Sequence, residues 1–275
     1  VAPTEAHPEF TAKERANVKV CVSNPNVAEQ IVDNWVAAGA RGRWINTCET
    51  DLGWGFCRCP ACTALDVPEP GESAANRSGQ FEEHLTDRYV HLANAVMRAA
   101  RKRGYDVGAS LYAYNQSERP PRRLALETNA FVSIVPTTLD LDELEARFSG
   151  WARAGAPALH LRPNLTRYFQ TVGLPLGIEK QFFDAFQIAY RHGAIGADYD
   201  RLMGQWALFG AADYILARAM GDPEKSFAYW MDHYCAAFGP AADDVKAYFR
   251  YWREEVWEKR LRPDLNAITE RGKWY

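Results

Sequence analysis

Short apolar runs rich in β-branched residues alternate along the chain with longer stretches in which apolar residues recur every three or four positions. The short runs predict strands, and the recurring stripes predict helices with one buried face. Strands are expected over residues 18–22, 44–48, 107–114, 131–135, 158–161 and 195–199. Because strands and helices alternate, the sequence predicts an α/β fold in which helices cover a parallel sheet.

The number of strands bears on whether the sheet closes into a barrel. A (β/α)8 barrel of the TIM type needs eight strands, so about six predict an incomplete barrel whose first strands lie upstream of Val1 or in another segment. We expect one domain over residues 1–275, with residues 201–275 as a helical portion packed on the barrel. A doubly wound open sheet is the alternative, but no glycine-rich phosphate-binding motif follows any predicted strand.

Capping residues mark several helix ends. Asn24 predicts the start of a helix that ends at Gly39. A longer helix over residues 81–103 carries acidic residues near its start and basic residues near its end, which suits the helix dipole. Asp140 and the pair Asp222-Pro223 predict the starts of two later helices.

Composition and charge argue against nucleic acid and anionic membranes as binding partners. The 275 residues are 47% hydrophobic and 24% charged, and 32 Lys and Arg face 35 Asp and Glu, for a net charge of −3. This balance provides no basic surface for nucleic acid or for an anionic membrane. The most apolar stretch, residues 206–220, is interrupted by Asp213 and Arg218, so the sequence predicts no membrane span.

Carboxylates follow the predicted strands, where a parallel α/β barrel places its chemistry. The four candidates are Asp51, Glu49, Asp198 and Asp200. A pair of carboxylates is what glycoside hydrolysis requires, because one protonates the leaving oxygen while the other attacks or activates water. Asp51 is the leading candidate. For Asp198 and Asp200 the alternative is an ordinary helix cap.

Aromatic, amide and basic residues stand close to these carboxylates in the sequence. The predicted substrate-binding residues are Trp54, Tyr112, Tyr114, Asn115, His160, Arg162 and Trp206. Aromatic rings stack on the apolar faces of sugars, and Arg162 suits the carboxylate of a uronic acid because its guanidinium binds bidentately. For His160 a hydrogen-bonded core position is the alternative. The sequence thus predicts a glycoside hydrolase that needs no cofactor for its reaction; a non-catalytic carbohydrate-binding barrel is the alternative.

Four cysteines are concentrated within 15 positions, namely Cys48, Cys57, Cys59 and Cys62. Four thiolates can hold a structural zinc ion in a tetrahedral site. The competing interpretations are a local disulfide between Cys48 and one of the other three, or free thiols. A bond between Cys57 and Cys59 is unfavourable because one intervening residue leaves little room for disulfide geometry. A zinc-stabilised interaction domain is therefore a third candidate function.

Several segments resemble a bacterial family described as domain of unknown function 4838. The resemblance rests on residues 7–10, 20–27, 51–62 and 193–196, and the Cys-x-Cys-x-x-Cys segment is its most specific part. Family members resemble glycoside hydrolases with (β/α)8 barrels, which implies carbohydrate as the partner. The resemblance also implies an upstream segment of the same parent protein and an extracellular or periplasmic location.

Overall fold

The computed structural model describes residues 19–48, 55–67, 85–127, 129–136, 140–163, 176–199 and 206–264. The chain divides into two compact units. The first comprises residues 1–135 and 146–160, and the second comprises residues 136–145 and 161–275.

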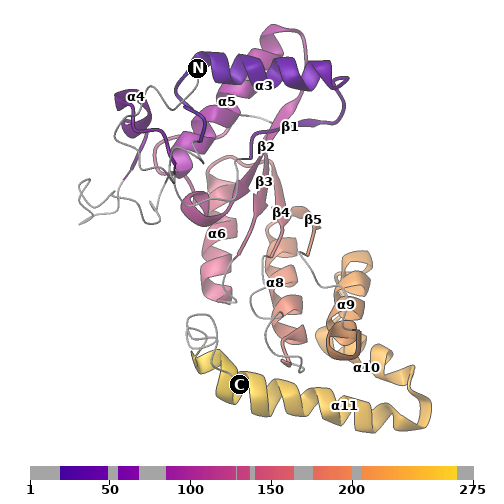
Figure 1. Cartoon of the computed structure of the whole chain (residues 1–275). Helices are drawn as coiled ribbons and strands as arrows, with labels where there is room; N and C mark the ends of the chain where they lie inside the picture. Colours follow the sequence, from indigo (N-terminus) through magenta and orange to yellow (C-terminus); the bar gives the residue numbers. More distant parts are fainter. Residues whose placement is uncertain are drawn as a thin grey trace. The chain divides into compact units, whose positions relative to one another are not determined.

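A five-stranded parallel sheet is the central element of the fold (Figure 1). Its strands follow one another in chain order: β1 (Trp44–Asn46), β2 (Gly108–Ala113), β3 (Phe131–Ile134), β4 (Ala158–Leu161) and β5 (Ala194–Ala197). Ile45 is paired with Ala109, and Leu111 with Val132. The α/β class predicted from the sequence is therefore confirmed, whereas closure into a barrel stays a prediction.

The predicted strand over residues 18–22 is wrong for the part that the structure describes. Residues 19–21 are irregular and Val22 begins a turn, with the amide of Asn24 donating to the carbonyl of Cys21 at 3.0 Å. Lys19 donates its amide to Gly55 at 2.9 Å, which lies in a loop. The apolar run is buried at Val22 because it packs into the core beside the following helix, not because it belongs to the sheet.

The part of the first unit that the structure describes combines strands with helices. The helices are α3 (Pro25–Ala37), α4 (Pro60–Thr63), α5 (Thr86–Lys102) and the 3-10 turn η2 (Asn115–Ser117), while α6 (Leu141–Arg153) contributes to both units. Helix α3 packs along α5, and α5 packs on β2 (Figure 1). Val32, Val96 and Ala100 are fully buried between these helices, so their apolar stripes supply the core that the sequence pattern predicts.

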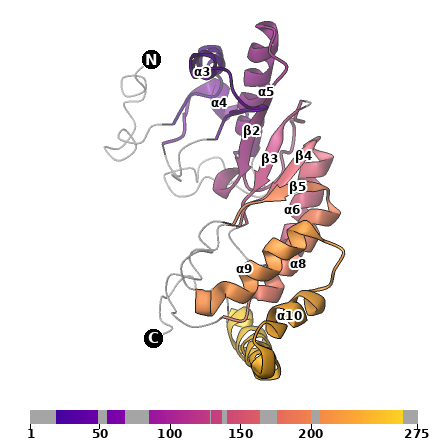
Figure 2. The same ribbon diagram turned by 90° about the vertical axis from the view of Figure 1, so that its right-hand side faces the viewer.

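The second unit is largely helical. Its elements besides β5 are α8 (Glu179–Arg191), α9 (Trp206–Gly221), α10 (Phe227–Ala236), η3 (Gly239–Ala241), α11 (Ala242–Tyr251), the π-helix η4 (Trp252–Leu261) and η5 (Arg262–Asp264). Helix α9 packs between α8 and α10 (Figure 2). Within the described part of the chain, we find no helix with the length and apolar character that a bilayer crossing demands.

Capping explains where three helices begin. The Asn24 side chain accepts from the amide of Asn26 at 3.0 Å at the start of α3, and Asp140 accepts from Glu143 at 2.9 Å, so both predicted caps are confirmed. The predicted start at Asp222-Pro223 is wrong. Helix α10 begins at Phe227, because the hydroxyl of Ser226 accepts from the amide of Tyr229 and supplies the cap.

Candidate functional site

The sheet of the first unit has two chemically different faces. Ile45, Leu111, Val132, Ile134 and Leu159 share one face and are 0–3% exposed. Strand residues that alternate with them must point to the other face. The first face is a hydrophobic core surface, and the second is where polar chemistry has room.

Aromatic and polar side chains gather on this second face, which we call the polar strand face and define by Trp44, Tyr112, Phe131, Ser133 and His160. Tyr112 is paired in register with Ser133 and is 39% exposed. The rings of Trp44 and Phe131 lie 4.9 Å apart between centroids, and those of Phe131 and His160 lie 5.3 Å apart. Three neighbouring rings on one face of a sheet give a platform suited to stacking.

A hydrogen bond fixes His160 on this face. Its Nδ1 lies 3.0 Å from the hydroxyl oxygen of Ser133, which is itself buried. The structure thus supports the alternative of a hydrogen-bonded histidine. Tyr114 and Asn115 follow the end of β2, where Asn115 adopts a left-handed φ of 49° at the start of η2. The chain therefore turns sharply at the carboxyl end of this strand.

Asp198 is the one predicted catalytic carboxylate that the described residues include. It follows β5, its amide donates to the carbonyl of Leu161 at 2.8 Å, and its carboxylate lies 3.7 Å from the guanidinium of Arg162. The Asp198 side chain is 65% exposed. The predicted residues Glu49, Asp51, Trp54 and Asp200 lie outside the described residues, and Trp206 opens α9 with a side chain that is likewise outside the description.

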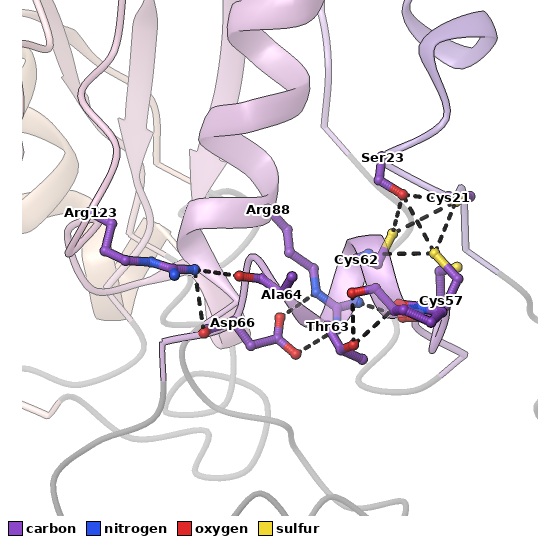
Figure 3. A network of polar contacts seen from close by, with 11 residues as sticks. Cys21, Ser23, Cys57, Cys62, Thr63, Ala64, Asp66, Arg88 and Arg123 are labelled. Carbon is purple, nitrogen blue, oxygen red and sulfur yellow. Dashed lines mark hydrogen bonds and ion pairs between the residues drawn. The ribbon is translucent and has the colours of Figure 1, made fainter.

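Four sulfur atoms converge in the first unit, from Cys21, Cys57, Cys59 and Cys62. Figure 3 labels Cys21, Cys57 and Cys62 of this group. All four lie within 4.8 Å of one another. The sulfur of Cys21 is 3.7 Å from that of Cys59 and 3.7 Å from that of Cys62. None of these cysteines forms a disulfide, so the group is a set of four thiols at a spacing compatible with a bound metal ion.

Cys48 does not belong to this group, which corrects the predicted ligand set. It follows β1, and its thiol lies 3.8 Å from the carbonyl oxygen of Ser110 on β2. Pairing of β1 with β2 therefore holds Cys48 beside the sheet. Cys21 takes its place because the turn before α3 places it against the segment that carries the other three cysteines.

Polar groups surround the four-cysteine group. The hydroxyl oxygen of Ser23 lies 3.2 Å from the sulfur of Cys62 (Figure 3). It lies 3.5 Å from the sulfur of Cys59. The amide of Cys62 donates to the sulfur of Cys59 at 3.4 Å, within the turn that starts α4. Burial opposes ionisation of Cys59, but the hydrogen bonds from Ser23 and Cys62 outweigh it and lower the pKa of this thiol to about 6.

Burial has the largest effect on the pKa of two other thiols of the group, Cys57 and Cys62. Burial raises the pKa of Cys57 and of Cys62 above the usual range of a thiol. Both are nearly inaccessible, at 4% and 0% exposure. A metal ion is what would offset the cost of placing several thiolates together in such a site, because ligation requires deprotonated sulfur.

A buried ion pair supports the loop behind the cysteines. Arg88 of α5 donates from Nε and Nη2 to the two carboxylate oxygens of Asp66, at 2.5 and 2.7 Å. Both side chains are less than 5% exposed. Arg123 donates to the carbonyl oxygen of Ala64 at 2.7 Å (Figure 3). Two arginines therefore fix the segment that leaves α4.

Sequence reasoning missed three contributors to this site: Cys21, Ser23 and Arg88. Cys21 is far from the other cysteines in the sequence, 38 residues before Cys59 and 41 before Cys62. In the sequence, Cys21 is marked as a possible ligand by little more than its position just before the predicted helix start at Asn24. Neither spacing nor periodicity reports a contact that depends on how α3 packs against α5.

Comparison with known proteins adds a family match. A family model described as domain of unknown function (DUF4838) matches residues 2–250. This match confirms the resemblance drawn from the sequence motifs. No curated protein and no solved structure matches the chain.

Proposed function

The chain belongs to the family described as domain of unknown function 4838, and from this premise we propose that it is a carbohydrate-active domain that hydrolyses a polysaccharide or oligosaccharide. The observation that carries the proposal is the polar strand face. Its exposed Tyr112 lies in register with Ser133. Ser133 is hydrogen-bonded to His160, whose ring lies against that of Phe131. Rings bind the apolar faces of sugars, and hydroxyl and imidazole groups bind sugar hydroxyls.

We assign the carboxylates of hydrolysis as the sequence suggests. Asp51 acts as nucleophile or base, with Glu49, Asp198 or Asp200 as its partner acid. In the second unit, Arg162 beside Asp198 suits a sugar ring that carries a carboxylate, since arginine binds carboxylates bidentately. A non-catalytic carbohydrate-binding domain is the second candidate, favoured by the engagement of Asp198 with Arg162.

Two tyrosines of similar exposure give a matched test of the sugar platform. Tyr112 is 39% exposed on the polar strand face, whereas Tyr190 is 41% exposed on α8 and donates to Glu224 at 2.8 Å. The purified protein is incubated with a panel of oligosaccharides that includes uronic-acid-containing ones, and products and binding are both measured. Tyr112→Ala is expected to lose at least about tenfold in binding, an effect of the size seen for losing a stacked ring, while Tyr190→Ala keeps it.

The catalytic part is tested by Asp51→Asn in the same assay. Products from the parent and none from Asp51→Asn, with binding retained, support hydrolysis by this carboxylate. Binding without products from either protein favours the non-catalytic candidate. Absence of both binding and products across the whole panel overturns the carbohydrate proposal.

We also propose that the four-cysteine group binds a zinc ion with a structural role. Thiolates in a tetrahedral set favour zinc, which carries no redox chemistry of its own. The ion stabilises the fold and takes no part in the reaction on the sugar.

A further inference from the structure

We infer that Cys21, Cys57, Cys59 and Cys62 form a closed zinc centre that joins the segment before α3 to the segment around α4. This inference rests on the zinc ion of the proposed function and adds which cysteine completes the site and what the site does. The critical assignment is Cys21 as the fourth ligand. Cys48, which is nearer in sequence to the other three, is not a ligand.

The sulfur geometry matches the metal. Zinc–sulfur bonds are about 2.3 Å long, so the edges of a regular ZnS4 tetrahedron are about 3.8 Å. The two distances from Cys21, to Cys59 and to Cys62, are both 3.7 Å. Sulfurs in a disulfide lie much closer, at about 2.05 Å. The two edges from Cys21 therefore match those of a tetrahedral zinc–thiolate site, and all four sulfurs lie within 4.8 Å of one another.

The composition of the group indicates a structural centre. Catalytic zinc sites keep one position open for water or substrate, whereas structural sites are filled by four protein ligands. Here four cysteines are available, and two of them, Cys57 and Cys62, are buried. Ser23 adds a hydroxyl against three of the sulfurs, those of Cys21, Cys59 and Cys62. Such outer hydrogen bonds orient metal ligands and tune the metal.

The position of the centre shows what it stabilises. Cys57 and Cys62 belong to the hydrophobic core that α3 and α5 share, together with Val22, Val32 and Val96. The helix α4, which begins just after Cys59, has only four residues and is too short to be stable by itself. A metal bond from Cys21 to this segment closes a long loop and fixes it against the core.

The test compares two single substitutions of cysteines that are both partly buried, Cys21→Ser and Cys48→Ser. Zinc per chain is measured by elemental mass spectrometry, and cobalt-substituted protein is examined for the absorption bands of tetrahedral thiolate coordination. We expect one zinc per chain in the parent and in Cys48→Ser. We expect Cys21→Ser to lose the ion or to bind it at least tenfold more weakly.

Because Cys21→Ser can fail to fold, alkylation of the parent protein gives an independent measurement. In the zinc-bound protein the thiols of Cys21 and Cys59 are expected to resist alkylation while Cys48 reacts, and a chelator should expose the two together. Absence of zinc from the parent overturns the zinc proposal itself. Zinc that survives Cys21→Ser, or is lost in Cys48→Ser, overturns only the ligand assignment.

Discussion

Arg88 donates a hydrogen bond from Nη1 to the backbone carbonyl oxygen of Cys57 at 2.7 Å. The same guanidinium holds Asp66 through its other two donors. One buried arginine of α5 therefore fixes both ends of the segment that contains three of the four clustered cysteines. The four-cysteine group and α5 are thus connected by a buried polar side chain as well as by the apolar packing of Cys57 and Cys62.

Replacement of Arg88 is expected to be strongly destabilising. Arg88→Ala removes the guanidinium that binds both carboxylate oxygens of the buried Asp66, and breaking a buried ion pair typically costs about 3–5 kcal/mol. The matched control is Arg98→Ala, also on α5, because Arg98 pairs with Glu127 at the surface with 48% of its side chain exposed. An exposed pair is worth less than about 1 kcal/mol. Urea unfolding of both variants checks the difference, and equal losses would contradict the role of Arg88.

Local signals in the sequence predict much of the fold correctly. Strand β4 occupies residues 158–161 as predicted, and α3 begins after Asn24 as its cap requires. The cap of α3 is a contact within two residues, and the apolar pattern that marks β4 is local even though its pairing with β3 and β5 is not. The strand expected at 18–22 fails because a short buried apolar run has the same pattern whether it pairs in a sheet or packs beside a helix.

The candidate site shows the same division between local and distant contacts. The Cys-x-Cys-x-x-Cys spacing indicates a metal site, since Cys59 and Cys62 share one turn and their proximity is local. Cys21, the fourth cysteine of the group, is positioned by the packing of α3 on α5. Pairing of β1 with β2 places Cys48 beside Ser110 instead. Sequence proximity therefore favoured Cys48, while tertiary structure favours Cys21.

Removal of the Ser23 hydroxyl is expected to weaken metal binding without unfolding the protein. Ser23→Ala deletes the hydrogen bonds to the sulfurs of Cys59 and Cys62, and loss of such an outer partner typically lowers metal affinity about 10–100-fold. Competition with a chromophoric chelator measures the affinity. Ser23→Thr should restore it, and Ser149→Ala should leave it unchanged because the hydroxyl of Ser149 donates to the carbonyl oxygen of Ala146 within α6. Equal affinities of Ser23→Ala and the parent would remove Ser23 from the centre.

Two glycines of the second unit allow the stability cost of steric overlap to be distinguished from the cost of a strained backbone conformation. Gly177 and Gly193 have nearly the same left-handed φ, +73° and +74°. A Cβ on Gly177 would overlap the backbone of Trp252, whereas a Cβ on Gly193 would meet nothing within 4 Å. Gly193→Ala should cost about 1–2 kcal/mol from conformation alone. Gly177→Ala should cost about 1–3 kcal/mol more because of overpacking. Thermal unfolding tests this order, and a smaller loss for Gly177→Ala would contradict the close approach of Trp252.

Asp213 gives the second unit a pH-dependent stability. One of its carboxylate oxygens is buried and has no hydrogen-bond partner among the described residues. Burial raises the pKa of this carboxyl from an ordinary 3.8 to about 6. Between these values the folded protein binds a proton that the unfolded chain releases, so the free energy of unfolding decreases as the pH rises through about 6.

Asp213→Asn is therefore expected to change how the free energy of unfolding depends on pH, and not only its value at one pH. Asparagine stays uncharged, so its free energy of unfolding does not depend on this proton. The stability of the variant relative to the parent should therefore increase as the pH rises from 4 to 8, with most of the increase complete by about pH 7. Urea unfolding at each pH measures the difference. Asp232→Asn serves as the control, since Asp232 is an exposed carboxylate paired with Lys246, and its variant should leave the slope near pH 6 unchanged. If parent and Asp213→Asn have parallel profiles across this range, the buried carboxyl does not carry the proton that the structure assigns to it.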